Sequence, residues 1–261
     1  MTIFKLGPIL ALGALTLSAP PAAAEPAARP TIVLVHGAFA GSSSWNPVVR
    51  ELQAKGYRVI AAANPLRSVA GDSDYVARVA RSVGGPVVLV GHSYGGEVIT
   101  GAAAGASNVR ALVFVSGFAP ESGESAASLS ARFPTGTLGQ TLSEPVSQAD
   151  GTSDVYIDQA KFPAQFAADV PREAAMEMAA TQRPITQEAL AEASKAPATW
   201  RTLPSYFVYG SLDRNIPAAL HSFMAKRAGA KATVAVSGAS HVVMISHPRE
   251  VARLIERAAK E

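Results

Sequence analysis

Three residues of the 261-residue sequence could together perform nucleophilic chemistry: Ser93, Asp213 and His241. A serine hydroxyl is a weak nucleophile at neutral pH, and it becomes effective when a neighbouring imidazole removes its proton. A carboxylate that accepts a hydrogen bond from that imidazole selects its tautomer and stabilises the protonated ring. We therefore expect Ser93 to be the nucleophile, His241 the base and Asp213 the acidic partner of the base.

Ser93 lies in the segment 91–96, whose sequence Gly-His-Ser-Tyr-Gly-Gly contains the pattern G-x-S-x-G. A serine among glycines is usually part of a loop, but here an apolar run at 87–90 precedes the pattern and a small-residue helix is expected after it. In that context the pattern is typical of a sharp strand-to-helix turn, where larger side chains at the glycine positions would collide with neighbouring strands. The turn would expose the hydroxyl at the N-terminus of a helix, whose dipole favours developing negative charge.

His241 is the best placed of the five histidines to act as the base. It follows the last predicted strand, 232–236, after a short loop that could carry the imidazole back over the sheet. The other histidines have simpler explanations: His36 organises a loop, His92 points away from the site, His221 lies on a helix surface, and His247 belongs to a helix-start turn.

Asp213 comes directly after the penultimate predicted strand, 206–209, in a segment that ends at Pro217. An aspartate shortly before a proline is more often a turn residue. This one, however, lies at the carboxyl end of a strand, and it stands between the serine and the histidine in the chain. The order Ser, Asp, His is the one expected where the serine occupies a strand-to-helix turn. Three other aspartates are poorer candidates: Asp150, Asp154 and Asp158.

Attack on a carbonyl group also needs hydrogen-bond donors for the oxyanion that forms. One donor should be the backbone N–H of Tyr94, directly after the nucleophile. The second should come from the loop after the first strand, segment 36–39, His-Gly-Ala-Phe, where we favour the Ala38 N–H with Phe39 as a neighbouring wall. The alternative is that this segment is only a tight turn.

The elements that position these residues alternate along the chain as strands and helices. Apolar runs rich in β-branched residues are typical of strands buried on both faces of a parallel sheet. The alternation predicts the α/β fold class, with a mostly parallel sheet and helices on both faces. The helix after the second strand is expected to start at Asp72 or Ser73. The predicted strands cover 31–35, 57–62, 87–90, 111–115, 206–209 and 232–236.

The alternation is interrupted between residues 121 and 200. This segment contains Ser/Gly/Glu-rich loops and several short helical signals, but no run typical of a buried strand. We therefore expect an insertion of small helices over the core rather than an independent domain. Residues 25–120 and 201–261 are then predicted to form the core, and residues 121–200 a cap.

Residues 1–24 have the features of a signal peptide: Lys5, an apolar stretch at 6–17, and the small-residue cleavage site Ala22-Ala23-Ala24. An uncleaved membrane anchor is the alternative, although the apolar stretch is shorter than the roughly 20 residues that span a bilayer. Cleavage after Ala24 predicts an exported protein, periplasmic or secreted, without a stable membrane anchor.

The composition excludes several classes of site. The sequence is 48% apolar and 16% charged, as in ordinary globular proteins. Its net charge is +3, and its Lys and Arg residues are scattered along the chain rather than clustered, so we expect no nucleic-acid partner. The absence of cysteine excludes disulfides, thiolate zinc sites and cysteine nucleophiles. We find no cluster of metal ligands and no phosphate-binding loop, so we expect no metal and no cofactor. Nothing in the sequence predicts the oligomeric state.

Four segments together resemble the α/β-hydrolase superfamily: Val33 to Phe39, Gly91 to Gly96, Tyr209 to Asp213, and Ser240-His241. More narrowly, the chain is similar to the branch that contains methyl-salicylate-type esterases, hydroxynitrile lyases and bacterial pyrethroid- or carboxylesterase-like enzymes. The resemblance covers essentially the whole chain after residue 24. It implies hydrolysis of carboxylic esters through an acyl-enzyme, without a cofactor, under a small helical cap.

Some positions depart from individual members of the superfamily. Hydroxynitrile lyases of this branch carry Thr after the loop histidine and Lys after the catalytic histidine, whereas this chain has Gly37 and Val242. Haloalkane dehalogenases and epoxide hydrolases use Asp at the position of Ser93. The resemblance therefore argues against cyanohydrin cleavage, dehalogenation and epoxide hydrolysis.

The expected partner is a small-molecule ester that binds between the sheet edge and the cap. Candidate substrate-binding residues are Phe39, Phe118, Tyr156 and Met176, with Phe133, Phe162 and Phe166 nearby, although each could instead belong to the core of the cap. Two alternatives remain open. One is lactone or amide hydrolysis, or perhydrolase-type acyl transfer to peroxide, on the same three residues. The other is a non-catalytic protein that binds a ligand under the cap.

Overall fold

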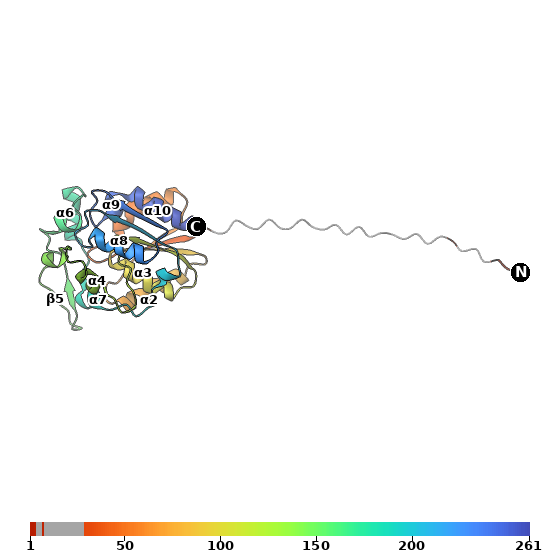
Figure 1. Ribbon diagram of the computed structural model, residues 1–261, viewed down its shortest axis with the longest axis horizontal. Helices are drawn as coiled ribbons and strands as arrows, with labels where there is room; N and C mark the ends of the chain where they lie inside the picture. The colour runs from red at the N-terminus through yellow and green to blue at the C-terminus, as the bar shows by residue number, and fades with distance from the viewer. Residues whose placement is uncertain (4–6, 8–28) are drawn as a thin grey trace.

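The computed structural model describes residues 1–3, 7 and 29–261, and its centre is a six-stranded parallel sheet (Figure 1). The strand order is β2-β1-β3-β4-β8-β9, and each neighbouring pair is parallel. The predicted signal peptide and its cleavage site lie outside the described residues, except at positions 1–3 and 7. The strands are β1 (Thr31–Val35), β2 (Val59–Ala62), β3 (Val87–His92), β4 (Val109–Val115), β8 (Ser205–Gly210) and β9 (Ala232–Val236).

The burial of each strand follows from its place in the sheet. β1, β3 and β8 are buried at every residue, because helices cover both of their faces. β9 forms one edge of the sheet, and only its last residue is buried. In the middle of the sheet, Phe114 stacks on Phe207 of the neighbouring strand with ring centroids 4.6 Å apart.

Two groups of helices cover the sheet, and the predicted α/β fold class is confirmed (Figure 1). On one face, α1 (Asn46–Ala54), α9 (Val243–Ser246) and α10 (Pro248–Lys260) contact one another. On the other face, α2 (Val69–Arg81) packs against α3 (Tyr94–Ala104), and α8 (Ala218–Arg227) packs against β8. Residues that recur with a helical period bury one side of α10: Val251, Leu254, Ile255 and Ala258.

The start of α2 differs from the prediction. Its N-cap is Ser68, whose hydroxyl accepts a hydrogen bond from the Gly71 N–H at 3.0 Å, and the helix begins at Val69. Asp72 is buried instead, and it accepts a hydrogen bond from the Tyr94 hydroxyl at 3.0 Å. Both residue types can cap a helix, so the sequence alone does not choose between them.

The segment between β4 and β8 forms a cap of short helices and a small antiparallel sheet. The sequence did not predict this sheet, because strands of two or three residues carry too few positions to show alternation. Its strands, in the order β5-β6-β7, are β5 (Val146–Ser147), β6 (Ser153–Val155) and β7 (Ile185–Thr186). The cap helices are α4 (Ala126–Ala131), α5 (Phe162–Phe166), α6 (Arg172–Ala180) and α7 (Gln187–Ala191). Short 3₁₀ turns cover Ser42–Trp45, Leu138–Thr141 and Thr199–Arg201.

Hydrogen bonds tie the cap to the core at several points. The Arg67 guanidinium pairs with Asp154 at 2.6 Å, and the Thr186 hydroxyl donates to the Arg67 carbonyl at 2.8 Å. The Trp200 indole N–H donates to the Pro120 carbonyl at 3.0 Å. The cap therefore packs as a continuation of the core in the described part of the chain.

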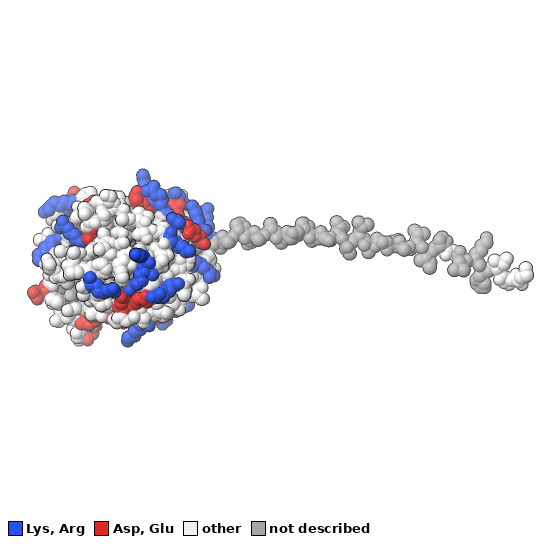
Figure 2. Space-filling view, in the orientation of Figure 1, with Lys and Arg blue, Asp and Glu red and all other residues white. Residues whose placement is uncertain are grey.

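The surface carries charges of both signs close to one another (Figure 2). Glu124, for example, pairs with Arg132 at 3.1 Å and with Arg227 at 2.8 Å. Within the described residues, we find no helix with the length and hydrophobicity needed to span a membrane.

Candidate active site

The turn between β3 and α3 places Ser93 in a strained backbone conformation. Its φ and ψ are 53° and −125°, a region that residues other than glycine rarely adopt. A Cβ atom at position 91 would overlap the Gly95 carbonyl oxygen, and one at position 95 would lie 2.5 Å from the Val35 carbonyl oxygen. The two glycines of the G-x-S-x-G pattern are therefore required by close packing, as the sequence predicted.

The loops that follow β8 and β9 meet at the same edge of the sheet. The Leu212 N–H donates to the Ala239 carbonyl at 2.9 Å, and a Cβ atom at Gly210 would overlap the carbonyl oxygens of Ala239 and Ser240. This close approach brings Asp213, from the first loop, to His241, from the second.

Asp213 and His241 form a buried hydrogen bond. His241 Nδ1 lies 2.7 Å from Asp213 Oδ2, and both side chains are fully shielded from solvent. Because a carboxylate only accepts, Nδ1 carries the proton and Nε2 of the neutral ring is free to accept one. Among the described residues, His241 Nε2 has no hydrogen-bond partner, and the structure shows no hydrogen bond between it and Ser93.

The Asp213 carboxylate has donors at both oxygens. Oδ1 accepts from the backbone N–H groups of Asn215 at 2.8 Å and Ile216 at 3.0 Å. Burial alone would raise the pKa of Asp213, but His241 and His221 interact with the charged form and hold the pKa well below its usual value. Asp213 is therefore ionised at neutral pH.

His92 contacts the loop that carries His241. Its Nε2–H donates to the His241 carbonyl at 3.2 Å, and the two ring centroids are 4.7 Å apart. As predicted, His92 does not line the cavity beside Ser93. Since His92 directly precedes Ser93, this contact joins the serine turn to the histidine loop.

His36 is buried beneath the first loop and holds it to the cap, which agrees with its predicted role. Burial lowers the pKa of His36 to about 4, so the ring is neutral at pH 7. Its Nδ1–H donates to the Gly37 carbonyl at 2.9 Å, and its Nε2 accepts from the Arg183 guanidinium at 3.2 Å. The Phe39 N–H donates to the Arg183 carbonyl at 2.9 Å, so that amide is already used by the cap.

The first loop also lies directly against the serine turn. A Cβ atom at Gly37 would be 2.6 Å from the Ser93 Cβ atom and 3.1 Å from the Tyr94 nitrogen. Tyr94 is the first residue of α3, so its N–H has no acceptor within the helix. The Ala38 N–H makes no backbone hydrogen bond within the described part of the chain.

Ser93 opens into a mostly apolar cavity of about 190 Å³ under the cap. Of the predicted substrate-binding residues, the structure places Phe39 and Phe118 in its wall, and Phe133 lies there as well. The sequence did not single out the aliphatic part of the wall: Leu138, Leu142, Leu190 and Ile216. These positions come from separate cap and core segments, and no local pattern links them.

The other predicted wall residues lie elsewhere. Met176 is on the outer side of α6 with 53% of its surface exposed, and Tyr156 is half-buried away from this cavity, so neither prediction is supported. Phe162 and Phe166 are buried in the cap, with their ring centroids 4.8 Å apart. The Phe166 ring also packs edge-on against His241 with centroids 5.0 Å apart, so it fixes the base rather than lining the cavity.

The prediction for His221 was wrong. It was expected on a helix surface, but only 1% of it is exposed, and its Nε2 lies 3.1 Å from Asp213 Oδ2. The signal that could have located it is the spacing to Met224 and Ala225, which share its buried side of α8.

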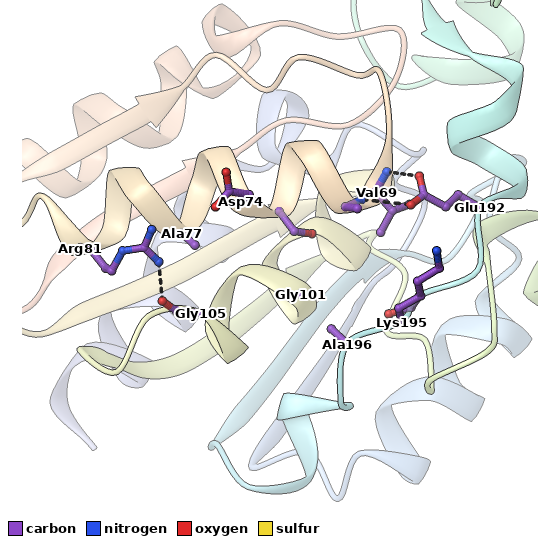
Figure 3. A pocket seen from close by; sticks show the side chains of 12 residues that line it. Val69, Asp74, Ala77, Arg81, Gly101, Gly105, Glu192, Lys195 and Ala196 are labelled. Atoms are coloured by element: carbon purple, nitrogen blue, oxygen red, sulfur yellow. Dashed lines mark hydrogen bonds between the residues drawn. The ribbon is translucent and has the colours of Figure 1, made fainter.

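A second pocket, of about 280 Å³, lies between α2 and α3 (Figure 3). Two charged side chains in its wall hold helix ends. The Glu192 carboxylate accepts from the Val69 N–H at 2.6 Å and the Ala70 N–H at 3.2 Å. The Arg81 guanidinium donates to the Gly105 carbonyl at the end of α3. These contacts hold helix ends, and Ser93 does not line this pocket.

The described residues contain no group of three or more His, Asp or Glu side chains that could hold a metal ion.

The fold and the serine turn define a class of protein, and the chain belongs to the α/β hydrolase family, whose model matches residues 32–254. The carbendazim hydrolyzing esterase of Nocardioides sp. (strain SG-4G) is 36% identical over 106 residues, which cover 36% of this chain and 44% of that protein. The match thus spans less than half of that relative's length.

Solved structures share the architecture. Polyneuridine aldehyde esterase superposes with a TM-score of 0.77 at 20% identity, over 88% of this chain and 100% of that one. The pyrethroid hydrolase of Sphingobium faniae JZ-2 superposes with a TM-score of 0.69 at 20% identity, over 88% and 97% of the two chains. The resemblance predicted from the sequence motifs is confirmed.

One buried acidic side chain lies outside the candidate site formed by Ser93, His241 and Asp213. Glu97 of α3 is fully buried, and neither carboxylate oxygen has a hydrogen-bond partner among the described residues. Burial raises the pKa of Glu97 well above its usual value. This effect outweighs the opposing influence of the nearby Ala126 backbone N–H, and the charges of Glu192 and Glu124 raise the pKa further. The native state therefore binds a proton that the unfolded chain releases at lower pH.

We predict that Glu97→Gln gains stability relative to the wild type as the pH rises from 5 to 8. The raised native pKa makes wild-type stability fall above the pKa of the unfolded chain, whereas a neutral amide of the same shape has no such dependence. The difference in unfolding free energy, measured by urea titration, should grow by up to about 1.4 kcal/mol per pH unit. The control is Glu144→Gln at an exposed site. If the unfolding free energy of Glu97→Gln changes with pH in parallel to that of the wild type, the raised pKa of Glu97 is contradicted.

Proposed function

We propose that this protein is a serine hydrolase that cleaves carboxylic esters through an acyl-enzyme, with Ser93 as nucleophile, His241 as base and Asp213 as the acid. The observation that carries the proposal is the buried 2.7 Å bond from His241 Nδ1 to Asp213 Oδ2, which leaves Nε2 without a partner among the described residues. The strained turn at Ser93 presents a hydroxyl at the same edge of the sheet. Membership of the α/β hydrolase family and the partial match to a named esterase add support.

In this mechanism Ser93 Oγ attacks the ester carbonyl carbon while His241 Nε2 takes the hydroxyl proton. Asp213 remains ionised and stabilises the imidazolium that results. The imidazolium then protonates the leaving alcohol, which departs and leaves the acyl group on Ser93. A water molecule then attacks the carbonyl carbon of the acyl-enzyme, with His241 again as base, and the carboxylic acid is released from Ser93.

We assign the oxyanion hole to the backbone N–H groups of Ala38 and Tyr94. Both residues line the cavity beside Ser93, and Gly37 allows the first loop to approach the serine turn closely. The Tyr94 N–H also stands at the start of α3, where the helix dipole favours an anion. Fixed donors of this kind stabilise the negative charge that develops on the carbonyl oxygen.

The cavity favours a small, uncharged acyl group. Its wall includes Phe118, Phe133 and Leu190, and no Lys, Arg, Asp, Glu or His of the described residues lines it. A protein cavity of about 150 Å³ holds a benzene molecule, so the roughly 190 Å³ available here suits a single ring or a short branched chain. We therefore propose esters of small aromatic or short aliphatic acids as the substrate class.

We further propose that the mature protein is exported. The support is the leader sequence alone: Lys5, the apolar stretch at 6–17, and the cleavage site ending at Ala24. An exported esterase of this kind would meet esters outside the cytoplasm.

The first prediction of this function concerns the nucleophile. Ser93→Ala should lower kcat/KM for p-nitrophenyl acetate by roughly 10³- to 10⁶-fold, because the attacking oxygen is lost. Ser82→Ala, at an exposed position at the end of α2, is the matched control and should keep wild-type turnover. Circular dichroism should show the same fold for both variants, and retained turnover by folded Ser93→Ala would reject the assignment.

The second prediction concerns the cavity. Among p-nitrophenyl esters of graded acyl size, kcat/KM should be highest for short-chain or benzoyl esters and fall for acyl chains longer than the cavity can hold. Phe133→Ala should move the preference towards larger acyl groups, because it removes a ring from the wall. A preference that does not change in this variant would show that the acyl group binds elsewhere. Lactones and amides in the same panel would separate ester cleavage from the other chemistries of a serine nucleophile.

A further inference from the structure

A second imidazole contacts the carboxylate of the proposed relay. His221, from α8, places Nε2 3.1 Å from Asp213 Oδ2, the same oxygen that lies 2.7 Å from His241 Nδ1. The side chains of His221 and Asp213 are 1% and 0% exposed, so water does not compete for this contact. Asp213 thus has four protein donors, two at each oxygen.

The surroundings keep His221 neutral. Burial lowers the pKa of His221, which outweighs the opposite effect of Asp213, and protonated His241 would lower it further. Three groups face the ring from neighbouring elements: Asp213 from the loop after β8, His241 from the loop after β9, and Tyr209 of β8, which stacks on it at 4.7 Å between centroids. Because Asp213 only accepts, His221 Nε2 carries the proton, and its Nδ1 has no partner in the described part of the chain.

We propose that His221 is a positioning residue of the catalytic machinery, acting through the Asp213 carboxylate. This inference rests on the proposed function of Ser93, His241 and Asp213. The neutral ring donates one hydrogen bond that holds the Oδ2 atom in place, while the Asn215 and Ile216 amides hold Oδ1. With both oxygens held, Oδ2 keeps one position opposite His241 Nδ1, and the imidazole keeps one orientation.

The same contact sets how strongly Asp213 acts on the base. A neutral donor withdraws part of the negative charge at Oδ2 without adding a positive charge that would oppose the imidazolium. Without the His221 donor, the negative charge at Asp213 Oδ2 interacts with His241 alone, and protonated His241 is stabilised more strongly. The base then stays protonated to higher pH, and the acidic limb of the pH–rate profile shifts to higher pH.

The test compares two variants at position 221. His221→Leu removes the donor, whereas His221→Gln keeps one, because the amide nitrogen is the same number of bonds from Cα as imidazole Nε2. For the ester that the wild type turns over best, we expect His221→Leu to lower kcat by about 10- to 100-fold with little change in KM. We also expect it to move the acidic limb of kcat/KM upwards by about 0.5–1 pH unit. His221→Gln should restore both quantities to near the wild-type values.

A purely structural role makes a different prediction. His221→Leu would then lower the melting temperature but leave kcat per folded molecule and the acidic limb unchanged, and that result would overturn the inference. If His221→Leu does not fold, His221→Asn replaces it, because its shorter amide cannot reach Oδ2. His221→Asn should behave as described for His221→Leu, and wild-type behaviour of His221→Asn would equally overturn the inference.

A readout that does not depend on turnover separates this inference from the proposed function. The His241 Nδ1–H bonded to Asp213 should give a low-field proton resonance, and loss of the His221 donor should shift it, while His221→Gln should leave it near the wild-type position. If the wild type cleaves no ester but the resonance responds in this way, the proposed function fails and the contact through Asp213 stands. A resonance unchanged in His221→Leu, or in His221→Asn where it replaces that variant, rejects the contact.

Discussion

Asp213 places a negative charge in a fully buried position, and the surrounding loops are arranged to satisfy it. An isolated buried carboxylate would take up a proton, because desolvation opposes the charged form. Here two backbone amides and two imidazoles donate to it, and the pKa of Asp213 falls instead of rising. The backbone donors close the loop that leads into α8, and the imidazoles join that loop to α8 and to the loop after β9. Loss of this charge would therefore affect both the fold at this edge and the orientation of His241.

Backbone strain is concentrated at the same edge of the sheet. Among the described residues, four that are not glycine have positive φ: Phe39, Leu66, Ser93 and Ser116. Each lies shortly after the carboxyl end of one of the strands β1 to β4, where open parallel sheets form their ligand sites. Strain of this kind persists only where the surrounding packing determines the conformation, and it is common at functional sites.

The cap takes part in this arrangement because it contacts the loops from above. Phe166 packs against the His241 ring, the Ser240 hydroxyl donates to Asp169, and Arg183 bonds both His36 and the Phe39 amide. The strands and the serine turn could be predicted from the sequence, because runs of apolar residues and paired glycines leave a local pattern. The three short cap strands could not, and neither could the aliphatic wall of the cavity, because these features depend on contacts between distant segments. His221 was misplaced for the same reason: its partner, Asp213, is on the preceding loop, and helix position alone gives only its buried side. The positions of Met176 and Tyr156 differ from the prediction because the type of a residue does not tell which side of the cap its side chain faces.

We propose that His241 and Asp213 activate Ser93 at one edge of the sheet. The most direct measurement is covalent labelling of the native protein with a fluorophosphonate, followed by mass spectrometry of the intact chain and its peptides. We expect one adduct per chain, located at Ser93, and none after unfolding in denaturant. A native protein that does not react, or that reacts at a different residue, would contradict it.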